Sequence, residues 1–207
     1  MSAIKLYRYP LSGHSHRVEL FLSILGLEAE IIDVDLANGE NQQEPFLNKN
    51  IFGQVPVLED GPVTIADSNA ILVYLASKYD SKRNWLPLGN EESAEVQRFL
   101  SIAAGEIAHG PASARLITVF GAEFDEDTLI RKSHELLETL EAHLKGREWL
   151  AGEKASIADI SNYTYIAHAP EGNISLNGYP SIRAWLKRVE ELPGFIAMSA
   201  TPVGLAA

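Results

Sequence analysis

The chain has 207 residues, a formal net charge of −11 and no cysteine. Its 28 acidic residues against 17 basic ones argue against general binding to nucleic acids or anionic membranes, since both depend on concentrated lysine and arginine. The lack of cysteine excludes disulfides and thiolate metal sites, so any thiol that reacts must belong to a ligand. With 46% hydrophobic residues, this length suits two packed domains.

The first eighty residues alternate between strand and helix patterns. The expected strands are residues 4–9, 30–36, 57–59 and 63–66, and the expected helices are 15–25 and 69–79, with a short helix or turn through Phe46 and Leu47. Asp60-Gly61-Pro62 lies between the last two strands and predicts a hairpin turn. The order βαβ followed by ββα predicts an α/β domain over residues 1–80.

A stretch with mixed polar, proline and glycine content, residues 81–90, is typical of a domain linker. Beyond it every pattern is helical, which predicts an all-α domain over residues 91–207. The first expected helix is long, beginning at residue 90 or 93 and ending near 120. The others cover residues 125–145, 156–169 and 181–191. Ser156 and Asp159 have the spacing of a capping box, and His109-Gly110-Pro111 predicts a kink in the first of these helices.

The segment 54–69 has the features of a peptide-binding site. Pro56 precedes a strand, where a cis bond is accessible and turns the backbone of Val55 outward, free to pair. Asp67 and Ser68 stand between the next strand and a helix, where unpaired amides favour an anion. Together these residues predict a strand edge beside an anion site.

Four motifs give the chain a resemblance, over nearly its whole length, to the cytosolic glutathione S-transferase family. They are Gly53-Gln54-Val55-Pro56-Val57-Leu58, Ala66-Asp67-Ser68-Asn69-Ala70-Ile71, the cap from Ser156 to Asp159, and Tyr179-Pro180-Ser181-Ile182-Arg183-Ala184-Trp185. The resemblance implies a thioredoxin-like N-terminal domain and an all-helical domain that forms the wall of an electrophile site. It also implies a cytoplasmic homodimer, of serine type (phi- or theta-like) and bacterial origin, with glutathione as co-substrate and no tightly bound cofactor.

The resemblance also implies which residues hold glutathione. The backbone of Val55, before the cis-proline, pairs with the cysteinyl part, and Asp67 and Ser68 hold the γ-glutamyl end. The expected glutathione-binding residues are Gln42, Gln54, Val55, Pro56, Asp67 and Ser68. An extended peptide on a strand edge gains main-chain hydrogen bonds while its charged ends need separate partners, which agrees with these roles.

Ser12 is the residue expected to activate the thiol. In tyrosine-type members the catalytic residue stands two positions before a proline, and here that position is Arg8. In the serine type the hydroxyl follows the proline by two residues and an arginine comes five residues later, which matches Pro10, Ser12 and Arg17. Ser12 would donate a hydrogen bond to the thiolate. Ser15 is the nearby alternative, expected to act as a helix cap.

The chain departs from phi-like enzymes where these carry His-Lys to bind the glycyl carboxylate, because Asn41 and Gln42 stand at the corresponding positions. Lys49 is the nearby residue that could supply the missing charge, although a solvated lysine is the favoured interpretation. The missing charge leaves three functions open. They are transfer of glutathione to a hydrophobic electrophile, in keeping with detoxification; glutathione-dependent peroxide reduction; and a non-catalytic role in binding a ligand or partner.

His14, His109, Arg115 and Tyr165 are the candidates for the electrophile site. His14 and His16 also form a His-x-His pair that invites a metal, but no third ligand is evident nearby, so no metal is expected. No segment approaches the roughly 20 apolar residues of a membrane span, and the N-terminus has no basic leader with a long apolar run. The sequence therefore predicts a cytoplasmic protein.

Overall fold

A computed structural model describes residues 4–206, and it divides the chain into two compact units. Unit 1 consists of Met1–Arg83 and Pro193–Ser199, and unit 2 of Asn84–Leu192 and Ala200–Ala207. The sequence assigns residues 193–199 to the helical domain, whereas the structure groups them with unit 1. His16 Nε2 lies 2.9 Å from the carbonyl oxygen of Ile196 and ties this segment to the first helix. The outer limits predicted for the domains, residues 1 and 207, lie outside the described residues.

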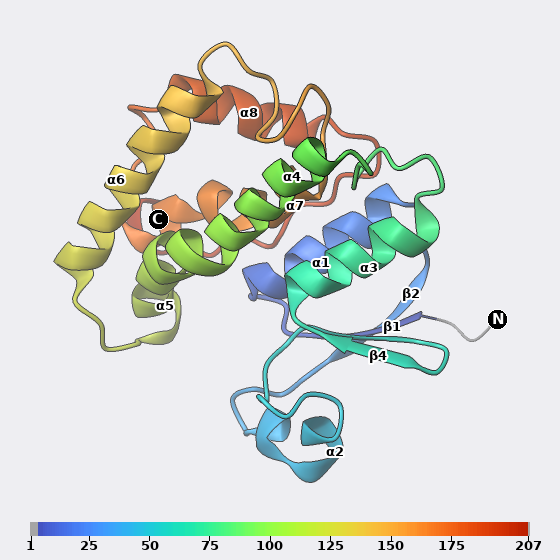
Figure 1. Ribbon diagram of the computed structural model, residues 1–207. Helices are drawn as coiled ribbons and strands as arrows, with labels where there is room; N and C mark the ends of the chain where they lie inside the picture. The colour runs from blue at the N-terminus through green and yellow to red at the C-terminus, as the bar shows by residue number, and fades with distance from the viewer. Residues whose placement is uncertain (1–3, 207) are drawn as a thin grey trace. The chain divides into compact units, whose positions relative to one another are not determined.

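Unit 1 is built on a four-stranded mixed sheet with the strand order β2-β1-β3-β4 (Figure 1). The strands are β1 (Ile4–Arg8), β2 (Ala29–Asp33), β3 (Val57–Asp60) and β4 (Val63–Ala66). β1 runs parallel to β2 and antiparallel to β3, and β3 pairs with β4 through a hairpin. This topology confirms the predicted thioredoxin-like domain.

Helices cover both faces of the sheet in unit 1 (Figure 1). One face carries α1 (Gly13–Ile24) and α3 (Ser68–Tyr79), and the other carries α2 (Glu44–Leu47), which follows the short η1 (Glu40–Gln42). The larger core consists of fully buried aliphatic and aromatic side chains, among them Leu6, Leu20, Phe21, Leu58, Ile71, Leu72 and Leu75. A smaller cluster of Val34, Phe46 and Val57 lies on the α2 face, with Val55 packed at its edge. Val55 is therefore positioned by packing from the sheet.

The first helix begins two residues before the predicted start. Ser12 adopts an extended conformation as its N-cap, and its Oγ accepts a hydrogen bond of 3.3 Å from the backbone N–H of Ser15. The cap is thus Ser12 and not Ser15, because both residues are good caps and only the packed start of the helix decides between them. Ser15 is fully buried, and its Oγ accepts from the N–H of Tyr9.

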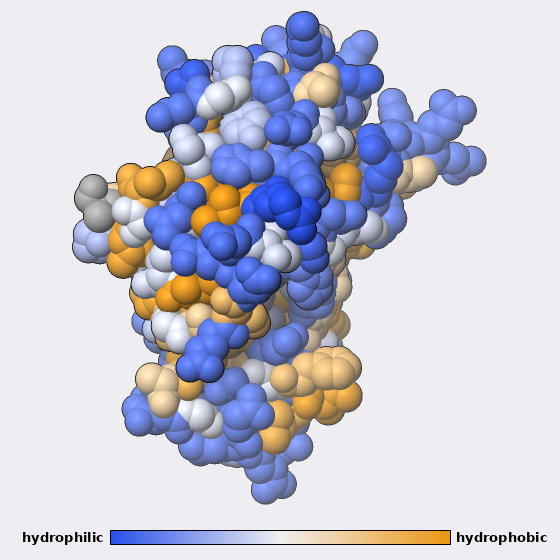
Figure 2. Space-filling model, turned by 90° about the vertical axis from the view of Figure 1, so that its left-hand side faces the viewer, coloured by the Kyte–Doolittle hydropathy of each residue, from blue (hydrophilic) through white to orange (hydrophobic). Residues whose placement is uncertain are grey.

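All regular elements among the described residues of unit 2 are helices, which confirms the predicted all-α domain. Its helices are α4 (Asn90–Ile102), η2 (Ala103–Ala112), α5 (Ser113–Phe120), α6 (Glu126–Leu144), α7 (Ile157–Ala167), η3 (Ala169–Gly172), α8 (Pro180–Glu190) and η4 (Gly204–Ala206). Between residues 4 and 206, no helix combines the length and the apolar character needed to cross a membrane. On the face in Figure 2, hydrophilic side chains separate the apolar groups from one another, in keeping with the charged composition.

The expected kink at Pro111 is instead a ten-residue π-helix, η2, that continues α4 into α5 without a break. Proline lacks the N–H that an α-helical bond would use, and the wider i→i−5 register accommodates this loss. Ser113 Oγ donates to the carbonyl oxygen of Ala108, five residues back, at 2.8 Å. Gly110 lets α6 approach closely, since a Cβ there would lie 3.1 Å from Ser133 Oγ.

The Ser156–Asp159 capping box is present at the start of α7, as predicted. Asp159 is fully buried and accepts hydrogen bonds from the N–H of Ser156, the N–H of Leu150 and Trp185 Nε1, each at 2.9 Å. Burial raises the pKa of Asp159 from its ordinary value, and these hydrogen bonds act against that rise. The cap thus joins the start of α7 to the preceding loop at Leu150 and to α8 at Trp185.

Candidate functional site

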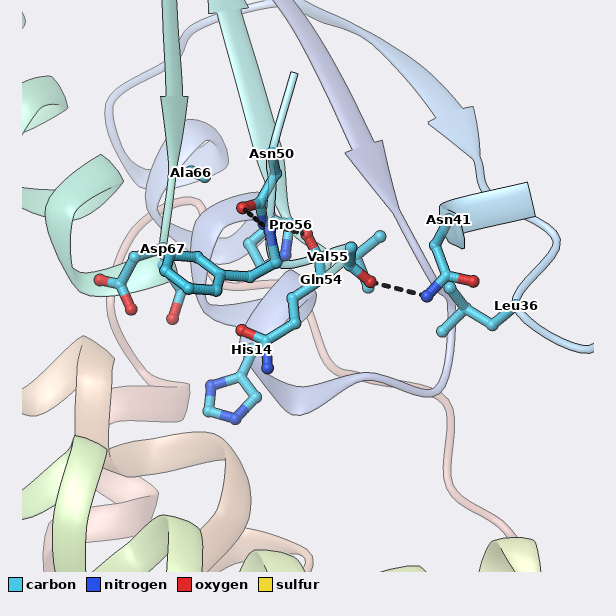
Figure 3. A pocket seen from close by; sticks show the side chains of 12 residues that line it. His14, Leu36, Asn41, Asn50, Gln54, Val55, Pro56, Ala66 and Asp67 are labelled. Carbon is cyan, nitrogen blue, oxygen red and sulfur yellow. Dashed lines mark hydrogen bonds between the residues drawn. The ribbon is translucent and has the colours of Figure 1, made fainter. Parts of the chain in front are cut away.

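A cavity of about 740 Å³ opens in unit 1 beside the segment that the sequence singled out (Figure 3). Its lining residues are His14, Leu36, Asn41, Asn50, Phe52, Gly53, Gln54, Val55, Pro56, Ala66, Asp67 and Ser68. In Figure 3, Asp67 lies at one end and Asn41 and Leu36 lie at the other, with Val55 and Gln54 between them. Val55 therefore lies between two polar ends of the lining, an arrangement that suits an extended ligand.

Val55 presents its backbone to the middle of this cavity. The Val55–Pro56 bond is cis, and β3 begins only at Val57. The carbonyl oxygens of the two preceding residues accept from side-chain amides, that of Gly53 from Asn41 Nδ2 at 2.6 Å and that of Gln54 from Asn50 Nδ2 at 2.8 Å. Within the described residues, the N–H and C=O of Val55 have no hydrogen-bond partner. This backbone is therefore available to a peptide.

Gly53 is required by the tight approach of this loop. Its φ of +60° lies in the left-handed region, and a Cβ there would lie 2.5 Å from Gln42 Nε2 and 2.9 Å from the carbonyl oxygen of Asn41. A side chain at this position would push the segment around Asn41 away from the cavity. The glycine thus holds one wall of the cavity against the strand edge.

Asp67 and Ser68 occupy the N-terminus of α3 at one end of the cavity. Asp67 is exposed and has φ 73°, which is uncommon for a residue other than glycine, and its Oδ1 accepts from the N–H of Ala70 at 2.8 Å. Ser68 is only 3% exposed, and its Oγ accepts from Arg17 Nη1 at 3.1 Å. Because Arg17 donates to this oxygen, the Ser68 hydroxyl hydrogen remains available to donate to an anion.

Arg17 connects the first helix to this anion site. The side chain is 1% exposed, and Nη1 also lies 3.1 Å from Asn69 Oδ1, so a single guanidinium nitrogen holds two neighbouring residues at the start of α3. Sequence spacing matched Arg17 to the serine type but did not predict this contact. Arg17 and Ser68 lie 51 positions apart, and no local sequence pattern connects them.

The other end of the cavity is lined by side-chain amides. Asn41 lines it, whereas Gln42, the residue expected to bind glutathione, is exposed and lies outside the lining, with Nε2 at 3.5 Å from the Gly53 carbonyl oxygen. Asn50 and Phe52 also line the cavity and were not predicted from the sequence. The direction of Asn41 depends on the left-handed turn at Gly53, which a motif match does not reveal.

Lys49 does not supply the positive charge that the amides lack. Its ammonium group is paired with the carboxylate of Glu59 and lies 4.7 Å from the centre of the Tyr7 ring. Tyr7 Oη donates to the same carboxylate at 3.0 Å. The hydrogen bond to Glu59 raises the pKa of Lys49, so this cation stays charged and bound to the sheet.

Neither Arg8, at the position of the catalytic residue in tyrosine-type enzymes, nor the adjacent Tyr7 lines the cavity. Tyr7 donates to Glu59, as described, and Arg8, at the expected tyrosine position, donates Nη1 to Glu19 at 2.5 Å and Nε to Asp33 at 2.8 Å. Arg8 thereby links β1, α1 and the end of β2. Its role in this chain is to fix the sheet against the helix.

Ser12 and His14 lie at the start of α1, Ser12 as its N-cap and His14 in its first turn. Ser12 is partly buried and is not among the residues that line the cavity, whereas His14 is. Burial, helped by the guanidinium of Arg17, lowers the pKa of His14 to about 3. His14 is therefore neutral at pH 7 and a weak base, so it is poorly suited to remove a proton from a thiol.

Of the other electrophile-site candidates, only His109 is exposed; it lies on η2. Arg115 is 1% exposed, and its Nε donates to Glu171 at 2.5 Å. Tyr165 is 6% exposed on α7. A buried ion pair and a buried aromatic ring hold unit 2 together and leave little surface for a substrate. The expectation for Arg115 and Tyr165 conflicts with this burial, since helical spacing alone did not distinguish the buried side of each helix from the exposed one.

Comparison with known proteins agrees with this geometry. Residues 2–77 match the family model of the glutathione S-transferase N-terminal domain, and residues 85–193 match that of the glutathione S-transferase C-terminal domain. The chain belongs to the cytosolic glutathione S-transferase family. This membership confirms the family, the fold and the enzyme class, glutathione S-transferase, that the sequence predicts.

Individual relatives cover almost the whole chain. Glutathione S-transferase 3 of Zea mays is 31% identical over 94% of this chain and 92% of its own length. The crystal structure of a glutathione S-transferase from Pseudomonas fluorescens has a TM-score of 0.90 at 32% identity and covers 96% of this chain and 100% of that one. A glutathione transferase homologue from Drosophila mojavensis, solved with bound glutathione, has a TM-score of 0.86 at 32% identity and covers 93% of this chain and 90% of that one.

Proposed function

We propose that this transferase binds glutathione in the cavity of unit 1 and activates its thiol by a hydrogen bond from Ser12, for attack on a hydrophobic electrophile. The observation that carries the proposal is the unpaired backbone of Val55 in the middle of a cavity that ends at Asp67 and Ser68. The structure of the Drosophila relative with bound glutathione supports the choice of ligand. Glutathione is a co-substrate in this scheme.

The γ-glutamyl end of glutathione fits the pair at the start of α3. The Ser68 hydroxyl and the backbone N–H of Ser68, which has no intrahelical acceptor, would both donate to the α-carboxylate. Asp67, exposed beside them, would accept from the α-ammonium group. Hydrogen bonds to charged groups contribute about 1.5–3 kcal/mol each, so this end supplies much of the affinity. Val55 pairs with the cysteinyl residue, with Pro56 and Gln54 beside it.

Ser12 is the proposed thiol activator because it lies at the N-terminus of α1 and its O–H group can donate a hydrogen bond. Its Oγ already accepts from the N–H of Ser15, which leaves the O–H to donate. The positive end of α1 adds to the preference for a thiolate. Ser15 cannot take this role as readily, since it is fully buried and bonded to the N–H of Tyr9. For the electrophile we retain His14 and His109 as contacts and leave out Arg115 and Tyr165.

The proposal is tested by calorimetric titration with glutathione, followed by assays of aryl-halide conjugation and hydroperoxide reduction. We expect binding together with conjugation. Binding with reduction alone would replace the transfer function with peroxide reduction. Binding without either activity would favour the non-catalytic carrier, for which the neutral amides at Asn41 and Asn50 are the supporting observation. Absence of binding would contradict all three.

The role of Ser12 has its own test in Ser12→Ala. Loss of a hydrogen bond to the thiolate should raise the pKa of the enzyme-bound thiol and lower conjugation at neutral pH by about 10- to 100-fold. The pKa is followed through the ultraviolet absorbance of the thiolate, with Ser15→Ala as the matched control, expected to leave it unchanged. A raised pKa in Ser15→Ala, and not in Ser12→Ala, would move the role to Ser15.

A homodimer and a cytoplasmic location complete the proposal, and both rest on membership of the family. Light scattering during size-exclusion chromatography is expected to give twice the chain mass of 22.7 kDa. A monomer that retains full activity would contradict the dimer.

A further inference from the structure

The cavity has an uneven distribution of charge. Of its twelve lining residues, Asp67 is the one that carries a charge at neutral pH, and it is negative. His14 also lines the cavity but is neutral at pH 7, since its pKa is lowered to about 3. No lysine or arginine is among the lining residues, all of which lie in the described part of the chain. Arg17 does not line the cavity, and it contacts the Ser68 end through the hydroxyl group of that residue.

The segment of chain that carries Asn41 is acidic. Residues 35–44, which include Asn41, contain three acidic residues and no basic one. They are Asp35, Glu40 and Glu44, all exposed. Hydrogen bonds from Asn38 lower the pKa of Asp35, which keeps it ionised. Lys49, the nearest lysine in the sequence, is paired with Glu59.

We propose that this cavity does not require the glycyl carboxylate of glutathione, and that it binds γ-glutamylcysteinyl peptides with an uncharged C-terminal end at least as tightly as glutathione itself. Asn41 is the residue that determines this specificity. The proposal rests on the function proposed above, because it takes the orientation of glutathione from the positions of Ser68 and Val55. A tripeptide that begins at Ser68 and pairs at Val55 places its third residue toward Asn41 (Figure 3).

Neutral amides recognise the shape of this end without recognising its charge. Asn41 Nδ2 can donate to the carbonyl oxygen of an ester or an amide as well as to a carboxylate oxygen. A carboxylate accepts a stronger hydrogen bond than an ester does, and a pairing cation adds further affinity, whereas like charges nearby oppose its binding. Within the described residues such a cation is absent from the cavity, and three carboxylates lie nearby in the chain.

The experiment compares glutathione with its glycyl monoethyl ester by calorimetry, on the full chain and with a reductant present. We expect the ester to bind with a Kd equal to that of glutathione within about threefold, or lower. At a site with a pairing cation, loss of the carboxylate charge would weaken binding by about tenfold or more. An ester at least tenfold weaker would therefore overturn the proposal while leaving the proposed function intact.

A variant that adds a positive charge at Asn41 tests whether this residue determines the preference between glutathione and its ester. Asn41→Lys should tighten binding of glutathione about two- to fivefold, the range of an exposed ion pair, and leave binding of the ester unchanged. Asn48→Lys is the matched control, because Asn48 is an exposed amide at the end of α2 that does not line the cavity. Equal tightening by both variants would show a general effect of the net charge of −11 and would overturn the role of Asn41. If neither ligand binds the folded wild-type protein, both this proposal and the proposed function fail.

Discussion

Two acid–serine pairs stand at helix N-termini in this protein, and they have opposite surroundings. Asp67 and Ser68 begin α3 in unit 1 and line an open cavity. Ser156 and Asp159 begin α7 in unit 2, where they are 3% and 0% exposed. Both pairs satisfy helix-start amides, as their residue types predict. The difference lies in what else their polar atoms contact.

The α7 pair is closed within the protein. Asp159 accepts from Ser156, Leu150 and Trp185, so its oxygens serve three segments of the fold. The α3 pair is open: Asp67 accepts one backbone bond, and the hydroxyl hydrogen of Ser68 is left for a ligand. The same residue types thus serve folding in one place and binding in the other, and the number of internal partners distinguishes the two.

The largest expected effect is that of Asp159→Ala on stability. This change removes the acceptor of four donors, the N–H groups of Leu150 and Ser156, Ser156 Oγ and Trp185 Nε1. Each buried donor left unpaired costs about 1–3 kcal/mol, so the free energy of unfolding should fall by about 4 kcal/mol or more. Urea denaturation measures the change. The matched control is Asp125→Ala, at the exposed cap of α6, which should cost about 1 kcal/mol.

Equal losses in Asp159→Ala and Asp125→Ala would show that the α7 pair acts only as a local cap. Binding of glutathione to the folded Asp159→Ala protein should match that of wild type, because Asp159 does not line the cavity. A large loss of affinity there would contradict the division into a folding pair and a binding pair.

Ser68→Ala is expected to have the second largest effect, and on affinity. Removal of the hydroxyl group takes away a hydrogen bond to a carboxylate and should weaken glutathione binding about 10- to 100-fold by calorimetry. The free energy of unfolding should change by less than about 1 kcal/mol, since Arg17 keeps its bond to Asn69. Ser101→Ala, an exposed hydroxyl group bonded to its own helix, is the control. A stability loss with unchanged affinity would make this pair a folding element too.

Much of the fold follows from local patterns in the sequence. Alternating and helical periodicity predicted each strand and the long helices, and the Val55-Pro56 and Asp67-Ser68 motifs predicted the position of the cavity. The misses have a common cause, because they depend on contacts between residues far apart in the chain. The burial of Arg115 depends on Glu171, 56 residues away, and that of Arg17 on Ser68. The π-helical register of η2 likewise could not be predicted, because the sequence does not show which hydrogen bonds replace the one that Pro111 cannot make.

The smallest expected effect is that of Arg17→Lys, which tests how Arg17 positions the open pair at the start of α3, Asp67 and Ser68. The guanidinium Nη1 holds Ser68 and Asn69 together, each at 3.1 Å, whereas a lysine ammonium on a flexible stem lacks the planar fork that fixes this geometry. The KM for glutathione should therefore rise about three- to tenfold, with kcat at saturating glutathione changed less than about twofold. Steady-state kinetics below the unfolding transition provides both numbers. A purely structural role would lower the free energy of unfolding and leave KM unchanged. Equal falls in kcat and kcat/KM would instead place Arg17 in the transition state, and the open pair would then extend from binding into catalysis.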